Sequence, residues 1–270
     1  MNKIKELYNK WFPKRDIDSR VGFLDEIRGA LIILMVIYHA IYTLSYTLFP
    51  DLYWIFENPI FNALRDVGAG LFIFICGVCC VFSRNNFKRG MIIFFAGILI
   101  TVVTVWFNNG DQQILWGILH FLGLSLILYD LLEKPLSKLK WWLGVPIFAL
   151  VFILTFGLRE GSLFGYIGVP FVEALQWEIP RSVSTIPYLF PLGITYGSFF
   201  TTDYFPLFPW FFLLLIGTFY GRRLKEGRAL KFVYKTHVRP LAFVGRHTLI
   251  IYLLHQPVIY GIVYILDLFI

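Results

Sequence analysis

The chain has 270 residues, of which 58% are hydrophobic, 19% aromatic and only 15% charged. This composition excludes a soluble globular protein, because a soluble core cannot account for so large an apolar share. The formal net charge of +7 indicates membrane topology and contact with anionic lipid, so a nucleic-acid partner is not expected.

Seven apolar stretches are long enough to cross a bilayer, which takes about 20 residues of α-helix. They predict an all-α bundle of about seven transmembrane helices, at residues 30–49, 61–82, 90–107, 113–131, 141–158, 206–221 and 247–268. Most of the connections are short, so consecutive helices are expected to be antiparallel neighbours. The chain shows no internal repeat.

The positions of the basic residues predict the orientation of this bundle. If the N-terminus lies inside, most of the 24 Lys and Arg residues fall in cytoplasmic segments, namely residues 1–22, 83–90, 132–140 and 221–240. The positive-inside rule therefore predicts a cytoplasmic N-terminus and an external C-terminus.

The sequence divides into a short tail and one large domain. Residues 1–22 alternate charged and aromatic side chains and are expected to form a cytoplasmic tail or a short helix on the inner leaflet. They have no apolar centre of the kind found in a cleaved signal peptide. Residues 23–270 are expected to form the transmembrane domain.

The first span carries the most informative residues. Asp25 and Arg28 stand where the span begins, and His39 follows Arg28 by eleven residues. Eleven helical residues rise about 16 Å and a bilayer core is about 30 Å thick, so His39 is expected near the midplane. An ionisable side chain at that depth indicates a functional site. An imidazole can take a proton from an amine or hydroxyl nucleophile, or accept an acyl group itself.

The second span adds one carboxylate and three thiols. Asp66 is a candidate for binding a substrate, and an ion pair with the adjacent Arg65 is the alternative. The spacing of Cys76, Cys79 and Cys80 matches a redox or metal pair. Small thiols within a span more often allow close helix packing, so neither a metal site nor a disulfide is expected.

Two further histidines fall within predicted spans. His120 lies in the fourth, and His255 lies in the last, nine residues beyond Arg246. By the same helical rise, both should reach a depth similar to that of His39. Each could equally satisfy its polarity with a neighbouring helix, and the sequence leaves both interpretations open.

Residues 159–205 form a long, outward-facing aromatic loop before the chain returns to the membrane. Loops of this length are usually lids, binding loops or disordered segments, and the aromatic content argues against disorder. At the return, Tyr204 and Trp210 suit an interfacial aromatic belt. Together with Asp203 they also offer what a carbohydrate site provides, an acceptor for hydroxyl groups and a stacking surface.

The basic residues also include candidates for binding phosphate groups. Anionic lipid headgroups explain the basic segment 222–239, and a phosphorylated cytosolic ligand is the alternative. Arginine is suited to bidentate contact with phosphate. The arginines available at the inner rim are Arg28, Arg84, Arg89, Arg222 and Arg246.

Three segments together resemble the heparan-α-glucosaminide N-acetyltransferase catalytic-domain family. The chain follows the bacterial pattern of this family, and the segments spread over most of it. They are Asp25-Glu26-Ile27-Arg28-Gly29 with His39, Asp203 to Trp210 with Gly217, and Gly245-Arg246-His247-Thr248-Leu249 through Tyr252-Leu253-Leu254-His255-Gln256-Pro257. The resemblance implies a multi-pass enzyme of the bacterial plasma membrane that moves acetyl groups from cytosolic acetyl-CoA to a glucosamine-type sugar outside.

The resemblance also implies roles for individual residues. His39 would be the catalytic base or acyl relay, Arg28 would hold the pantetheine-phosphate end of acetyl-CoA, and the segment from Asp203 to Trp210 would border the acceptor site. The remaining candidates are Asp25 and His255 for catalysis, Arg246, Arg84 and Arg222 for acetyl-CoA, and Asp66, His120 and Gln256 for the acceptor. Eukaryotic lysosomal members differ, because they have asparagine at the position of His39 and their catalytic histidine just after it.

Several alternatives stay open at this level. The acceptor could be an amino sugar or a hydroxyl of a surface polysaccharide, and transfer could be direct or pass through an acetyl-histidine. A homodimer is compatible with the sequence. A proton-coupled transporter of small solutes would also use histidines and an aspartate at mid-membrane, although the odd number of spans and the absence of a repeat argue against it.

Overall fold

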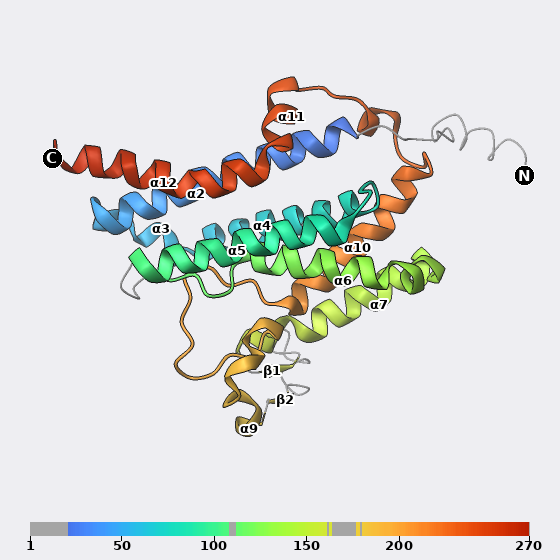
Figure 1. Cartoon of the computed structure of the whole chain (residues 1–270), viewed down its shortest axis with the longest axis horizontal. Helices are drawn as coiled ribbons and strands as arrows, with labels where there is room; N and C mark the ends of the chain where they lie inside the picture. Colours follow the sequence, from blue (N-terminus) through green and yellow to red (C-terminus); the bar gives the residue numbers. More distant parts are fainter. Residues whose placement is uncertain (1–20, 108–111, 161, 164–176, 179, 270) are drawn as a thin grey trace, which may run out of the picture. The chain divides into compact units, whose positions relative to one another are not determined.

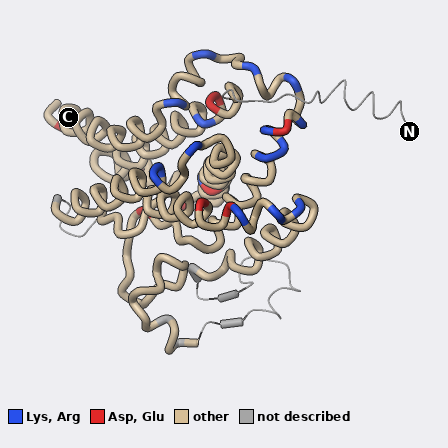
Figure 2. Tube along the Cα trace, turned by 45° about the vertical axis from the view of Figure 1, so that its right-hand side comes forward, with Lys and Arg blue, Asp and Glu red and all other residues tan. Residues whose placement is uncertain are grey.

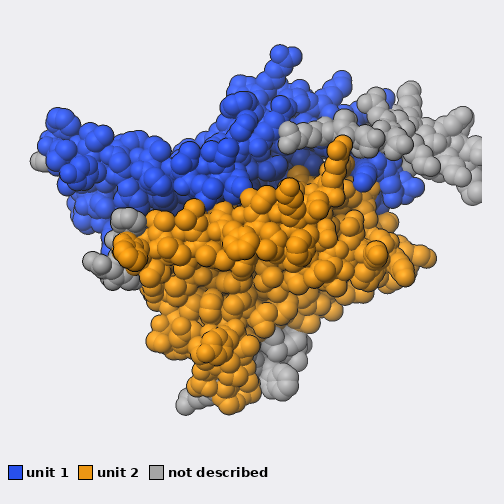
Figure 3. All heavy atoms as spheres, viewed as in Figure 1, with its two compact units in different colours: residues 1–75, 223–270 blue, residues 76–222 orange. Residues whose placement is uncertain are grey.

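The computed structural model describes residues 21–107, 112–160, 162–163, 177–178 and 180–269. The predicted N-terminal tail or interfacial helix, residues 1–22, therefore lies almost entirely outside the described residues. The chain forms two compact units, one made of Met1–Ile75 with Arg223–Ile270 and the other of Cys76–Arg222 (Figure 3). We call them unit 1 and unit 2.

Unit 1 is built around one long helix. Helix α2 (Gly22–Thr47) packs along α11 (Arg239–Arg246) and α12 (Thr248–Asp267), which come from the other end of the sequence (Figure 1). The short helices η1 (Pro50–Leu52) and α3 (Trp54–Glu57) connect α2 to α4 (Pro59–Cys80), whose first part belongs to this unit, and η4 (Lys231–Tyr234) precedes α11.

Glycines allow α2 and α11 to approach very closely. A Cβ atom added to Gly29 would overlap the carbonyl group of Leu241, and one added to Gly245 would overlap the carbonyl group of Asp25. Small residues at helix crossings let backbones come together, and this is a common device where helices pack in membranes. The charged residues beside these two glycines are therefore held at one crossing.

Unit 2 contains the remaining long helices. Helix α5 (Asn86–Phe107) packs on α6 (Ile118–Lys138), and the others are α7 (Trp141–Thr155), which continues into η2 (Phe156–Glu160), and α10 (Leu207–Lys225). Shorter elements between α7 and α10 are β1 (Ser162–Leu163), β2 (Trp177–Glu178), α9 (Arg181–Ser184) and η3 (Pro187–Leu192). The strands pair antiparallel, with Ser162 opposite Glu178. This pair, α9 and η3 lie in the predicted aromatic loop, much of which falls outside the described residues.

The cysteine-containing end of α4 packs against α10 within unit 2. A Cβ atom on Gly77 would overlap the carbonyl group of Leu214, so the two backbones are in close contact. The thiol of Cys80 donates a hydrogen bond of 3.2 Å to the carbonyl oxygen of Cys76, and none of the three cysteines, all within the described residues, forms a disulfide. These contacts support the interpretation that small residues here serve helix packing.

Each predicted span overlaps a long helix, so the all-helical class is confirmed. Among the described helices, five are long and apolar enough to cross a membrane: α2, α4, α5, α7 with its extension to Leu158, and α12. Helices α6 and α10 are not among these five, and the last turn of α10 is basic. The count of seven spans and the orientation of the termini stay predictions. Figure 2 shows Lys and Arg gathered along the chain that leads from α10 into α11.

Candidate active site

Two histidines from opposite ends of the sequence meet between α2 and α12. The ring centroids of His39 and His255 are 5.0 Å apart, and the ring planes are inclined by 80°. Tyr38 lies edge-on to His39, and Tyr252 lies beside His255. The structure thus brings together the two histidines that the sequence placed at similar depth in the first and last spans.

Each of these rings has Nδ1 against a carbonyl oxygen of its own helix. His39 Nδ1 lies 2.9 Å from the oxygen of Met35, and His255 Nδ1 contacts the oxygen of Tyr252. A carbonyl oxygen can only accept, so in the neutral ring Nδ1 carries the proton and Nε2 carries the lone pair. The Nε2 atom of His255 is buried and has no hydrogen-bond partner among the described residues. Each ring can therefore accept a proton at Nε2.

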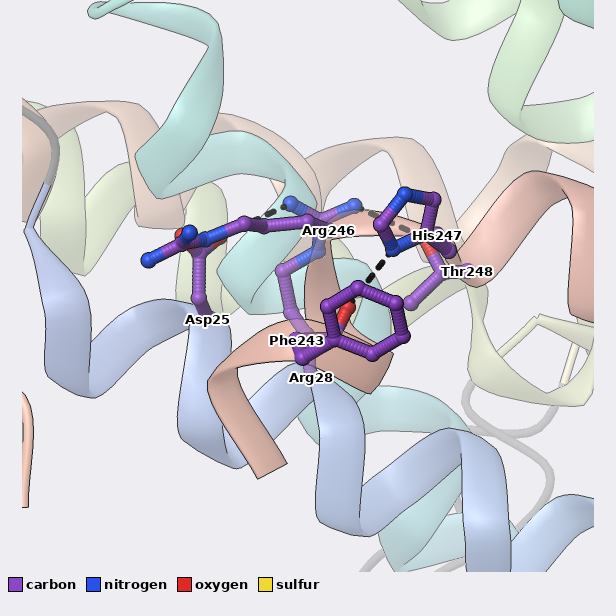
Figure 4. Close-up of polar contacts among 6 residues, drawn as sticks. All are labelled: Asp25, Arg28, Phe243, Arg246, His247 and Thr248. Atoms are coloured by element: carbon purple, nitrogen blue, oxygen red, sulfur yellow. Dashed lines mark hydrogen bonds and ion pairs between the residues drawn. The ribbon is translucent and has the colours of Figure 1, made fainter. Parts of the chain in front are cut away.

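An arginine and carboxylate cluster lies where α2, α11 and the start of α12 meet (Figure 4). Arg28 Nη2 donates a hydrogen bond of 2.8 Å to Thr248 Oγ1, and Arg28 Nη1 lies 3.5 Å from Asp25 Oδ1. On the other side of the carboxylate, Arg246 Nε lies 3.5 Å from Asp25 Oδ2. Asp25 therefore orients two arginines, and the ion-pair partners that it has among the described residues are these guanidinium groups. We call Asp25, Arg28, Arg246 and Thr248 the inner cluster.

The inner cluster fits a phosphate group by charge and by available donors. Two guanidinium groups face one carboxylate, so one positive charge is in excess. Arg28 Nε is buried and donates no hydrogen bond within the described residues. The side chain of Arg246 is 45% exposed, against 18% for Arg28. A ligand could therefore reach Arg246 from solvent, whereas Arg28 is held in place by its neighbours. Charge-assisted hydrogen bonds from arginine to phosphate are among the strongest in proteins.

Gln256 and Asp66, two residues that the sequence suggested for binding the acceptor sugar, lie in unit 1 and contact polar side chains. Thr43 Oγ1 on α2 donates a hydrogen bond of 3.4 Å to Gln256 Oε1 on α12, directly after His255 in the sequence. Asp66 is exposed and accepts a hydrogen bond of 2.8 Å from Arg65 Nε. The ion pair that the sequence left open for Asp66 is therefore present.

Asp203 belongs to unit 2 and lies at the N-terminus of α6. Its Oδ2 atom accepts a hydrogen bond of 3.1 Å from the backbone N–H of Ile118, the first residue of α6. A Cβ atom on the preceding Gly117 would crowd this carboxylate. A carboxylate is well suited to the unpaired N–H groups and positive dipole of a helix start, so the position of Asp203 supports a capping role.

The neighbours of Asp203 are also held by contacts within unit 2. Tyr204 donates a hydrogen bond of 2.7 Å from its hydroxyl to the carbonyl oxygen of Phe190. Trp210 packs among three phenylalanine rings, with centroids 5.7 to 6.2 Å away. These rings belong to Phe152, Phe156 and Phe205. The segment thus forms an aromatic core beside the start of α6.

His120 also belongs to unit 2, and both of its ring nitrogens have partners. The backbone N–H of Gly117 donates to His120 Nδ1 at 3.3 Å. The other nitrogen must then carry the proton, and Nε2 lies 3.3 Å from Thr101 Oγ1. The Thr101 hydroxyl donates in turn to the carbonyl oxygen of Ile114 at 2.7 Å. This chain of bonds supports the interpretation that His120 satisfies its polarity with its neighbours.

The other two arginine candidates lie in unit 2. Arg222 Nη1 donates a hydrogen bond of 2.8 Å to the carbonyl oxygen of Leu136 near the end of α6, and the guanidinium lies 4.2 Å from the centroid of the Phe219 ring. Arg84 is exposed in the turn between α4 and α5. Of the arginines suggested for acetyl-CoA, the structure brings Arg28 and Arg246 together within one unit.

The family model described as heparan-alpha-glucosaminide N-acetyltransferase, catalytic, matches residues 20–257. The chain belongs to this family. Searches of curated proteins and of solved structures gave no match.

Family membership and the apolar helices together make the protein a multi-pass membrane acyltransferase of the acetyltransferase type. The family implies an acetyl donor of the acetyl-CoA type and a carbohydrate acceptor. No group of three or more His, Cys, Asp or Glu side chains within the described ranges could hold a metal ion.

One residue of this region, Glu26, was not among the candidates from the sequence. It is buried, and its Oε1 atom accepts the backbone N–H groups of His237 and Val238 at the start of α11. Its Oε2 atom lies 3.5 Å from His237 Nδ1. Glu26 therefore fixes the start of α11 onto α2, and with it the helix that carries Arg246. The sequence could have indicated Glu26, because it is a second carboxylate, next to Asp25, at the start of an apolar span.

Proposed function

We propose that the protein transfers an acetyl group from cytosolic acetyl-CoA to an amino sugar or glycan on the external side of the bacterial plasma membrane. The observation that carries this proposal is the His39–His255 pair on α2 and α12, the helices that also carry Asp25, Arg28 and Thr248 of the inner cluster. The proposed proton acceptor and the proposed phosphate site thus belong to one compact unit.

The inner cluster is the proposed site for the phosphate end of acetyl-CoA. Arg28 and Arg246 supply the positive charge, and Asp25 and Thr248 fix the direction of the guanidinium groups. Arg28 and His39 are separated by about 16 Å along α2, which suits a donor that extends a pantetheine arm from its phosphates towards the histidines. Only the acetyl group then needs to cross the membrane.

His39 is the proposed general base. The acceptor amine or hydroxyl attacks the carbonyl carbon of the thioester, and His39 Nε2 takes the proton that the nucleophile loses. The C–S bond breaks as the new C–N or C–O bond forms, and the leaving thiolate of CoA receives the proton from the imidazolium. No oxidant or metal is required. We favour direct transfer over an acetyl-histidine, because direct transfer requires His39 only to accept a proton and return it.

His255 is the proposed second member of the catalytic pair. Its ring lies against His39 and presents the same nitrogen, Nε2. The nucleophile loses a single proton in each turnover. We therefore assign to the pair one proton per turnover.

The predicted topology agrees with this direction of transfer. The basic residues that follow α10 and the first turn of α2 would face the cytoplasm, while the connection between α2 and α4 would face outward. Residues 23–270 then form one transmembrane acyltransferase domain. O-acetylation of a surface polysaccharide uses the same base and differs only in the nucleophile.

The proposal is tested by transfer from radiolabelled acetyl-CoA to glucosamine oligosaccharides with the purified full chain. We expect wild type to transfer label and His39→Ala to lose transfer while keeping its thermal stability and its affinity for CoA. His247→Ala is the matched control, because His247 Nδ1 contacts the carbonyl oxygen of Phe243 one turn earlier, as His39 contacts that of Met35. Near-normal turnover in His39→Ala would remove His39 from the mechanism. A wild-type protein that binds no CoA would refute the acetyl-CoA mechanism proposed here.

A further inference from the structure

The connection between α2 and α4, residues 48–58, presents large aromatic side chains and carboxylates together. Tyr53 and Trp54 are 42% and 61% exposed. Asp51 and Glu57 stand on either side of them and are also exposed. With the predicted orientation, this connection lies on the outer side of the membrane.

This connection has a fixed geometry. Asn58 Oδ1 accepts the backbone N–H groups of Ile60 at 2.9 Å and Phe61 at 3.3 Å, so it caps the start of α4. Asn62 Nδ2 donates a hydrogen bond of 2.9 Å to the carbonyl oxygen of Phe56. The turn of helix α3 that carries Trp54 is therefore tied to the first turn of α4.

A continuous row of rings links this connection to His39. The ring of Tyr38 lies 5.4 Å from that of His39 and 5.4 Å from that of Phe56. Phe56 lies in turn 5.9 Å from Tyr53, whose side chain is exposed. Tyr42 packs on Phe56 from the side at 5.2 Å. We call these four residues, Tyr38, Tyr42, Tyr53 and Phe56, together with Trp54, which follows Tyr53 in the sequence, the aromatic strip.

We propose that the aromatic strip, with Asp51 and Glu57, binds the amino-sugar acceptor and leads it to His39. Aromatic faces offer large contact area for the apolar face of a pyranose ring. Carboxylates beside them would attract the protonated amine of glucosamine. This inference rests on the proposed function, and it assigns the acceptor to unit 1, whereas the carboxylate of Asp203 caps α6.

Sugar binding can be separated from an interfacial aromatic belt by a matched pair of tryptophans. Trp54 is 61% exposed in the connection, and Trp106 is 80% exposed at the end of α5, which the predicted topology places on the same side. In an interfacial aromatic belt, Trp54 and Trp106 would have the same role, so replacing either one would have the same effect. A sugar site uses only Trp54.

The experiment measures binding of a fluorescent tetrasaccharide of β-linked glucosamine to the full chain in nanodiscs without acetyl-CoA. We expect Trp54→Ala and Tyr53→Ala each to weaken binding by about fivefold to tenfold, and Trp106→Ala to leave it unchanged. The pair Asp51→Asn with Glu57→Gln should weaken binding of this probe but not of its fully N-acetylated form. The dissociation constant for CoA should be unchanged in all of these variants.

The outcomes separate the two proposals. Equal effects of Trp54→Ala and Trp106→Ala, or no effect of either, would overturn the sugar site while acetyl transfer by wild type still supports the enzyme. A wild-type chain that binds the tetrasaccharide through Trp54 but binds no CoA would support the sugar site and refute the acetyl-CoA mechanism. Absence of binding by wild type would overturn the assignment of this acceptor to the aromatic strip.

Discussion

Arg28 on α2 donates a hydrogen bond of 2.8 Å to Thr248 at the first turn of α12. This bond joins the helix that carries His39 to the helix that carries His255. The same guanidinium faces Asp25, which also faces Arg246. A ligand that binds these arginines would therefore act on the two helices that hold the histidine pair.

Arg28→Ala should raise the KM for acetyl-CoA more than about tenfold, because one charge-assisted hydrogen bond is worth about 1.5 to 3 kcal/mol. Steady-state kinetics with varied acetyl-CoA measure this directly. Arg228→Ala is the control, since Arg228 is an exposed arginine of unit 1 that pairs with Glu226. An unchanged KM in Arg28→Ala would place the phosphate groups elsewhere.

Thr248→Val should raise the KM for acetyl-CoA by a smaller factor, about threefold to tenfold, with little change in kcat. Valine has nearly the shape of threonine but cannot accept the hydrogen bond from Arg28, so the guanidinium loses one of its fixed partners. Thr248→Ser keeps the hydroxyl and should restore the wild-type KM. If serine fails to restore it, the effect of valine comes from packing and Thr248 does not position Arg28.

Gly245→Ala should destabilise the protein by about 1 to 3 kcal/mol or more, because the new methyl group would overlap the backbone of α2 at Asp25. Gly261→Ala in α12 is the control, since a Cβ atom there meets nothing within 4 Å. Alanine is the better helix former by roughly 0.5 to 1 kcal/mol, so this control should be neutral or stabilising. Thermal unfolding in detergent compares the two. Equal stability of both variants would contradict the close helix crossing.

The histidine pair shows what the sequence could predict. His39 lies eleven residues beyond Arg28 and His255 nine residues beyond Arg246, and helical rise is nearly constant. Depth could therefore be calculated without knowing how the helices pack. The contact between the two rings could not be predicted in this way, because it depends on how α2 packs against the C-terminal helices. The glycine crossing of α2 with α11 involves residues more than two hundred positions apart in the sequence, and such a contact produces no periodic pattern.

The start of α6 shows what the sequence could not predict. The apolar pattern suggested a span from residue 113, whereas α6 begins at Ile118. The preceding residues instead pair with the segment around Asp203: the N–H of Leu115 bonds to Thr201 Oγ1, and Trp116 forms a bridge with Tyr204. Local hydropathy cannot predict these contacts, because the two segments are more than 80 residues apart in the sequence. For the same reason, the contact of Asp203 with the start of α6 could not be predicted from the sequence, and a role of Asp203 in binding a substrate stays a prediction.

Asp203→Ala should lower thermal stability while leaving the KM for a sugar acceptor unchanged. Removing a carboxylate that caps a helix costs about 1 kcal/mol, within a range of roughly 0.5 to 2. Asp203→Asn keeps an oxygen that can accept the N–H of Ile118 and should retain most of the stability. Thermal unfolding and acceptor kinetics on the same preparations separate the two roles. A raised acceptor KM in Asp203→Asn at normal stability would assign Asp203 to the substrate site, because asparagine preserves the cap but not the charge.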